Sequence, residues 1–83
     1  MITDSVFTTA LILDKKEVIH FVFHDEEGDW HFMPNRAVEA DEAAMASVNQ
    51  MLDLDASLED VLSLPCGSMA ERKNSNKWLI KKM

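Results

Sequence analysis

All three histidines of the chain, His20, His24 and His31, lie in one segment, residues 17–33. Imidazole nitrogens bind zinc at about 2.0–2.1 Å, and Asp29 could complete such a site as a fourth ligand. In the hairpin predicted below, His31 lies diagonal to the other two histidines, at roughly 7–8 Å between backbones. His20 and His24 cannot chelate alone, since four residues of strand span roughly 13 Å. The three histidines are therefore candidate metal ligands, with ordinary packed or solvated histidines as the alternative that we favour.

The middle of this segment is acidic, because Asp25, Glu26, Glu27 and Asp29 surround Gly28. These residues lack the spacing and the closing glutamate of a calcium-binding EF-hand loop. We interpret them as charges that keep a turn in water and that could attract a basic protein. Glu26, Glu27 and Asp29 are the residues for which we predict contact with a partner.

The residues around the acidic turn predict a β-hairpin over the whole segment. A loop of Asp25–Gly28 places Phe23 opposite Trp30, and alternate residues share a face. We therefore expect one wholly apolar face. It carries four aromatic residues in two facing pairs, Phe23 with Trp30 and Phe21 with Phe32. At the loop mouth the same register makes His24 face Asp29, and we expect a hydrogen bond between them.

Segments on both sides of the hairpin predict an α+β fold. Residues 5–13 are rich in β-branched and apolar types, which favours a first strand. Apolar residues at helical spacing predict a long helix over about 40–53 and a short helix over about 56–63. Residues 68–83 are typical of two short strands around a polar turn at 74–76.

Together these elements predict a single domain, residues 1–83. We expect a small antiparallel sheet of about four to five strands, with both helices packed on the aromatic face of the hairpin. A strand edge exposed at residues 78–80 could pair with a second copy, which leaves both a monomer and a homodimer open.

The distribution of charge along the chain limits the classes of function that we expect. The net charge is −7, and residues 17–60 contain twelve acidic residues and one basic residue, Arg36. Such a surface repels nucleic acid, whose binding needs cationic side chains. No stretch approaches the roughly 18 apolar residues of a membrane span, and a basic leader with a cleavage site is absent from the start. We therefore expect a cytoplasmic protein whose partner, if it has one, is a basic protein.

Catalytic motifs are missing from the sequence. Cys66 is the single cysteine, which rules out an internal disulfide and a multi-cysteine zinc site. It follows a predicted helix end, so the sequence gives it no activating neighbour. The serines have no nucleophile elbow, and two glycines cannot make a phosphate loop. We predict no enzymatic activity and no cofactor.

Several short motifs occur in a characteristic order along the chain. They are Val6-Phe7-Thr8-Thr9, His24-Asp25-x-x-Gly28-Asp29-Trp30-x-Phe32, Asp55-x-Ser57-Leu58, Leu64-Pro65-x-Gly67-x-x-Ala70-x-Arg72 and Trp78. In this combination the chain resembles a set of small bacterial proteins of unknown function. It is more distantly similar to a bacterial family classed among the immunity proteins of polymorphic toxin systems, which neutralise a toxin by binding it.

The resemblance implies roles for some residues. The shared pattern contains His24, Asp29, Trp30, Phe32 and Arg72. Each of these residues has a structural explanation, as part of a turn hydrogen bond, as a core aromatic residue or as part of an ion pair at a sheet edge. His20 and His31 lie outside the pattern. We therefore expect a non-enzymatic, immunity-like interaction module that binds its partner through an acidic surface. A domain that binds a metal or small ligand on the histidine-bearing face is the alternative.

Overall fold

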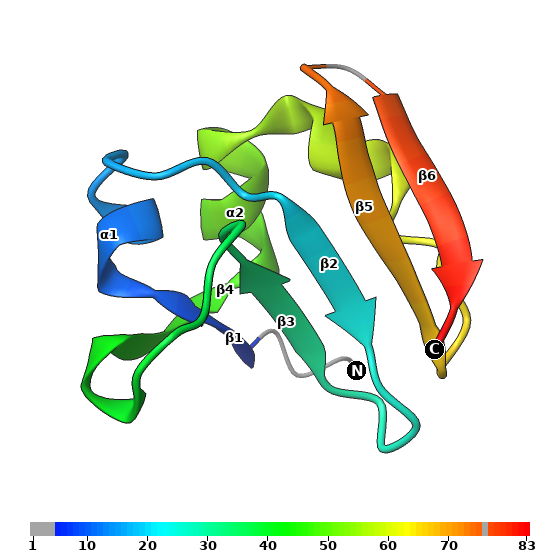
Figure 1. Ribbon diagram of the computed structural model, residues 1–83, viewed down its shortest axis with the longest axis horizontal. Helices are drawn as coiled ribbons and strands as arrows, with labels where there is room; N and C mark the ends of the chain where they lie inside the picture. Colours follow the sequence, from blue (N-terminus) through cyan, green and yellow to red (C-terminus); the bar gives the residue numbers. More distant parts are fainter. Residues whose placement is uncertain (1–4, 76) are drawn as a thin grey trace.

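The computed structural model describes residues 5–75 and 77–83, which form a mixed six-stranded sheet with short helical segments (Figure 1). The strand order is β4-β1-β3-β2-β5-β6. The strands are β1 (Ser5–Thr9), β2 (Phe21–His24), β3 (Trp30–Met33), β4 (Ala43–Ser47), β5 (Ser68–Asn74) and β6 (Lys77–Lys82). The helices are α1 (Ala10–Leu13) and α2 (Val48–Leu54), with 3₁₀ turns η1 (Ala40–Glu42) and η2 (Ala56–Asp60). The α+β class is confirmed, but six strands exceed the four to five predicted.

One face of the sheet is packed against α2 and η2. The core there joins Val22 and Phe32 of the central strands to Met51 of α2 and Leu58 of η2, all with no exposed surface. In Figure 1, the end of β3 passes in front of α2. The prediction that the helical segments cover one face is therefore confirmed, although these segments are shorter than expected.

The hairpin of β2 and β3 is confirmed, but its predicted register is wrong. Phe23 lies opposite His31, and Trp30 lies opposite His24. The loop has five residues, Asp25–Asp29, because the Asp25 N–H donates to the Asp29 carbonyl and closes it at 3.0 Å. One extra loop residue changes which residues of the two arms share a face. Gly28 has a φ of +93°, a left-handed conformation that glycine adopts without strain.

This shift separates the four aromatic residues that were predicted to share a face. Phe32 and Trp30 lie on the covered side with Val22 and His24, whereas Phe21 and Phe23 lie on the other side. The helical segments therefore pack on only half of the predicted aromatic set.

The long helix predicted over 40–53 is wrong in its first half. Ala43–Ser47 form strand β4, which pairs antiparallel with all five residues of β1. Alanine favours helix by less than about 1 kcal/mol per residue, and tertiary pairing overrides so small a preference. The helix α2 starts only after Ser47, whose hydroxyl accepts from the Gln50 N–H while Gln50 accepts from the Ser47 N–H.

The first predicted strand, residues 5–13, divides into β1 and α1. Thr9 ends the strand and caps the helix, because its hydroxyl accepts from the Ile12 N–H. The neighbour of β1 on its other side is β3, and the two run parallel. The hydroxyl of buried Thr8 donates to the Phe32 carbonyl at 2.9 Å and ties these strands together. The sheet is therefore mixed and not purely antiparallel.

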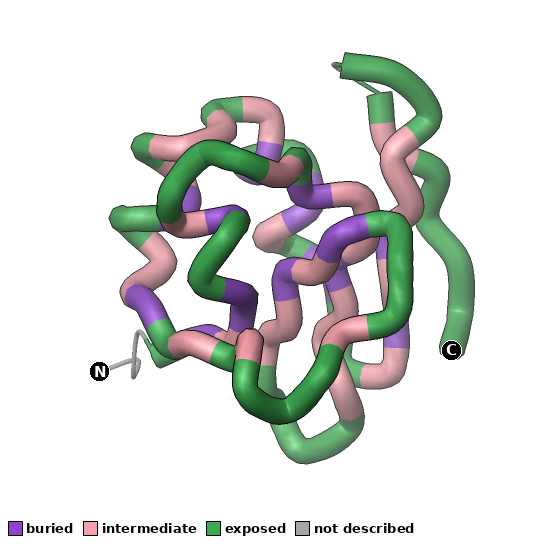
Figure 2. The backbone as a smooth tube through the Cα atoms, turned by 60° about the vertical axis from the view of Figure 1, so that its left-hand side comes forward, coloured by how far each residue is buried: buried purple, intermediate pink, exposed green. Residues whose placement is uncertain are grey.

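The chain end follows the prediction closely. The predicted short helix appears as η2, and β5 and β6 pair as two antiparallel strands. β6 is an edge strand of the sheet, and Figure 2 shows it mostly exposed. Lysines flank the exposed Leu79 and Ile80, as in edge strands that avoid pairing with other chains. No helix in residues 5–75 and 77–83 has the length and apolar character needed to cross a bilayer.

Candidate interaction surface

The side of the sheet opposite α2 carries apolar side chains, and we call it the open face. Residues that point away from the core alternate with core residues along each strand. The apolar and aromatic residues among them are Phe7, Phe21, Phe23, His31, Met33, Met45 and Met69, and each is half-buried or exposed. Towards β6 the face also carries Glu71 and Lys81, which form an ion pair. A sheet face in water usually carries polar residues. The middle of the open face is apolar instead, which is typical of a surface that contacts another molecule.

Aromatic rings contact one another across the open face. The Phe7 and His31 rings stack with centroids 5.0 Å apart, and the Phe21 and Phe23 rings stack at 5.8 Å. Because β1, β3 and β2 are neighbouring strands, these two stacks lie on adjacent parts of one surface. Offset or stacked rings of this kind hold one another in place and give a surface of defined shape.

A shallow pocket of about 430 Å³ opens beside these rings. Phe21, Phe23 and Met33 form one wall, and the segment from Pro34 to Val38 forms the other. Arg36 fixes that segment, because its guanidinium donates to both Glu17 and Glu42. The hydrogen bond from Arg36 is the main cause that lowers the pKa of Glu42 to about 2, and the Glu39 N–H adds to it. The pocket is therefore bounded by a segment that the ion pairs of Arg36 hold in place.

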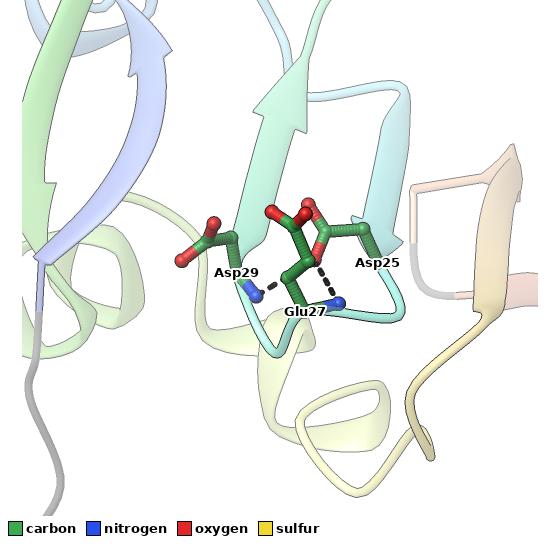
Figure 3. A group of neighbouring side chains, drawn as sticks. All are labelled: Asp25, Glu27 and Asp29. Carbon is green, nitrogen blue, oxygen red and sulfur yellow. Dashed lines mark hydrogen bonds between the residues drawn. The ribbon is translucent and has the colours of Figure 1, made fainter.

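The carboxylates of the hairpin loop lie at one end of the open face (Figure 3). Asp25 accepts from the Nε2–H of His31, an open-face residue, at 2.9 Å. Glu27 and Asp29 approach Asp25, and the three side chains offer oxygens within 4.8 Å of one another. Like charges this close repel each other, so a cationic group of a partner would be stabilised here.

Asp25 also builds the loop. One of its oxygens accepts from the backbone N–H groups of Glu27 and Asp29, at 3.0 and 2.9 Å. The hydrogen bond from His31 is the main cause that lowers the pKa of Asp25, and the Asp29 N–H adds to it. Asp25 therefore stays ionised as a structural residue, while Glu27 and Asp29 remain exposed.

Of the three predicted contact residues, Glu27 and Asp29 thus lie together, and Glu26 lies apart. A methyl group added to Gly67 would lie 3.5 Å from Cγ of Glu26, so Glu26 leans towards the loop before β5. The acidic residues expected at the surface are exposed on the hairpin loop, and Glu26 of that loop is directed towards the neighbouring loop that contains Gly67.

The structure does not bring the three histidines together. His20 pairs with Glu71 at 3.6 Å and His31 with Asp25, both through Nε2. His24 instead contacts the Leu64 carbonyl through Nδ1 at 2.7 Å. Within the described chain, the one group of three possible metal ligands consists of Asp25, Glu27 and Asp29 and contains no histidine. The corrected register explains this, because it places His24 and His31 on opposite faces.

The predicted hydrogen bond between His24 and Asp29 is also replaced by other contacts. The His24 ring stacks on Trp30 with centroids 3.9 Å apart, and its Nε2 lies 3.7 Å from Sγ of Cys66. No local pattern in the sequence indicated this pair, because 42 residues separate His24 from Cys66.

Arg72 forms an ion pair as expected, but not at a sheet edge, because its strand β5 lies between β2 and β6. Its guanidinium pairs with Asp55, donates to the Ile19 carbonyl and lies 4.3 Å from the centroid of the Trp78 ring. Asp55 accepts from the Ser57 hydroxyl, which in turn accepts from Nε1 of Trp78. The motif residues of the second half of the chain therefore form one connected network on the covered side.

Comparison with known proteins adds no assignment. The chain matches no protein-family model, and no curated protein and no solved structure shows significant similarity to it. The resemblance to immunity proteins therefore stays a prediction.

Proposed function

We propose that this protein is a non-enzymatic interaction module that binds a basic protein through the open face and the acidic hairpin loop. The observation that carries the proposal is the apolar character of the open face. Phe7, Phe21 and Phe23 occupy positions on this face where a sheet in contact with water usually has polar residues. Aromatic and methionine side chains are enriched at protein interfaces, and both kinds are concentrated here.

The charges beside the open face support a basic partner. Asp25, Glu27 and Asp29 border this face, and the chain as a whole carries a net charge of −7. A complementary positive surface would be steered towards this end of the sheet and oriented on it. An immunity-like role, in which binding blocks a basic toxin, is the specific form of the proposal that the sequence resemblance favours.

Charge reversal of the hairpin loop tests the proposal. The variant Glu26→Lys/Glu27→Lys/Asp29→Lys keeps Asp25 and its turn hydrogen bonds, so the fold should be preserved. The tagged variant and wild-type protein serve as baits in native lysate, and the affinity for the protein retained by wild type is then measured in purified form. We expect the variant to bind about tenfold or more weakly, because it presents like charges to a basic partner.

The control carries the same change of charge on the other side of the molecule. Asp53→Lys/Glu59→Lys/Asp60→Lys alters exposed residues of α2 and η2, the elements that cover the core face. This control should bind like wild type. Equal weakening by both variants would mean a general charge effect, and unchanged binding of the loop variant would refute the role of the loop.

A further inference from the structure

Cys66 and His24 form a thiol–imidazole pair at the surface. Cys66 is exposed in the loop between η2 and β5, and His24 is the last residue of β2. Sγ of Cys66 lies 3.7 Å from Nε2 of His24, within contact distance for a hydrogen bond to sulfur. A thiol beside an imidazole is the arrangement in which a histidine can accept the thiol proton.

The contact of His24 with Leu64 fixes which ring nitrogen can act as the base. Nδ1 lies 2.7 Å from the Leu64 carbonyl oxygen. A carbonyl oxygen only accepts, so Nδ1 must carry a hydrogen. In the neutral ring the lone pair is then on Nε2, the nitrogen that faces the Cys66 thiol.

Two further contacts hold the pair in place. The His24 ring lies almost parallel to Trp30, with an interplanar angle of 11°. The Gly67 N–H donates to the His24 carbonyl at 2.7 Å, which ties the cysteine loop to the end of β2. Thiol and base are therefore held in place before any reagent arrives, and such positioning speeds a reaction.

We propose that Cys66 is a modification site that forms mixed disulfides with small disulfides from solution. Nε2 of His24 takes the proton of the thiol, and the Cys66 thiolate attacks one sulfur of the reagent. The disulfide bond of the reagent breaks as the new sulfur–sulfur bond forms, and the departing thiolate takes the proton from His24. The number of disulfide bonds is unchanged, so no other oxidant is needed.

The surrounding charges select the class of reagent. Glu26 lies beside Gly67, next to Cys66, and Glu27 and Asp29 belong to the same hairpin loop. Lys82 lies opposite Ser68, so these three carboxylates outweigh one lysine on this side of the molecule. These carboxylates attract cationic disulfides and repel anionic ones. The preferred reagent is therefore a small disulfide with amino groups.

The test measures the rate of modification of the full-length protein by cystamine, a cationic disulfide, by mass spectrometry near neutral pH. Cys66→Ser confirms the site. His24→Asn keeps an amide donor for the Leu64 carbonyl and removes the base. We expect His24→Asn to react at least about tenfold more slowly, because the loss of a general base can reduce a rate by this factor. The wild type should also react about tenfold faster than the same chain unfolded in denaturant, a comparison that needs no variant.

Charge selection is tested with oxidised glutathione, an anionic disulfide. Cystamine should react faster than oxidised glutathione with the folded protein, and Glu26→Gln should reduce that difference. Equal rates for folded and unfolded wild-type protein would overturn the proposal, as would an unchanged rate in folded His24→Asn. A preference for oxidised glutathione would overturn the assignment of the reagent class.

Discussion

At the scale of single residues, most of the sequence motifs contain a side chain that contacts two or more other residues, and these contacts explain why the residue is needed there. Asp25 closes the hairpin loop and also binds His31. Arg72 connects Ile19, Asp55 and Trp78, which are distant in the sequence. An ion pair of Arg72 was expected from the sequence. Its partner Asp55 could not be identified, because nothing in the local pattern pairs these two residues.

Replacing Arg72 should destabilise the protein. The Arg72 side chain is 10% exposed and Asp55 is 21% exposed, so Arg72→Met leaves a partly buried carboxylate without its cation. We expect a loss of about 2–3 kcal/mol in the free energy of unfolding, below the 3–5 kcal/mol of a fully buried pair. Urea unfolding measures the loss, with Lys73→Met at the exposed neighbouring position as the control. A change of similar size in both variants would contradict this role of Arg72.

At the scale of secondary structure, the number of residues in one loop decides what each face of the sheet carries. The hairpin and its acidic turn were predicted correctly from the sequence. The sequence did not predict the length of the loop, because the closing Asp25–Asp29 hydrogen bond and the Asp25 side-chain bonds extend the turn by one residue. The four aromatic residues of the two strands are compatible with either register, so the residue types alone do not predict which register forms.

The two registers predict different effects of truncating Phe32 and Phe23. In the structure Phe32 has no exposed surface and Phe23 is half-buried on the open face. Phe32→Ala should therefore cost about 3–5 kcal/mol in the free energy of unfolding, and Phe23→Ala about 1 kcal/mol. Denaturant unfolding of both variants gives the comparison. Equal losses would favour the register in which both rings share the core face.

At the scale of the whole molecule, contacts between distant segments were the least predictable. Residues 43–47 look helical in isolation, but pairing with β1 makes them a strand. The parallel pairing of β1 with β3 has no local signal either, and it brings Phe7 onto the same face as His31. The acidic surface could be predicted because charge depends on composition. The open face could not be predicted, because its residues come together only through the order of the strands in the sheet.

Binding of a protein partner through the open face is tested with a variant that lacks two of its aromatic rings. Phe21→Ser/Phe23→Ser removes one ring stack without touching the buried core. The control Leu11→Ser/Val18→Ser changes two other exposed apolar residues, of which Val18 lines a separate pocket beside Leu54. Affinity is measured for the purified partner that wild-type protein captures, after NMR spectra confirm that each variant is folded.

We expect Phe21→Ser/Phe23→Ser to bind at least about tenfold more weakly, because aromatic anchors are lost, while the control binds like wild type. A folded Phe21→Ser/Phe23→Ser variant with wild-type affinity would show that the open face does not bind the partner.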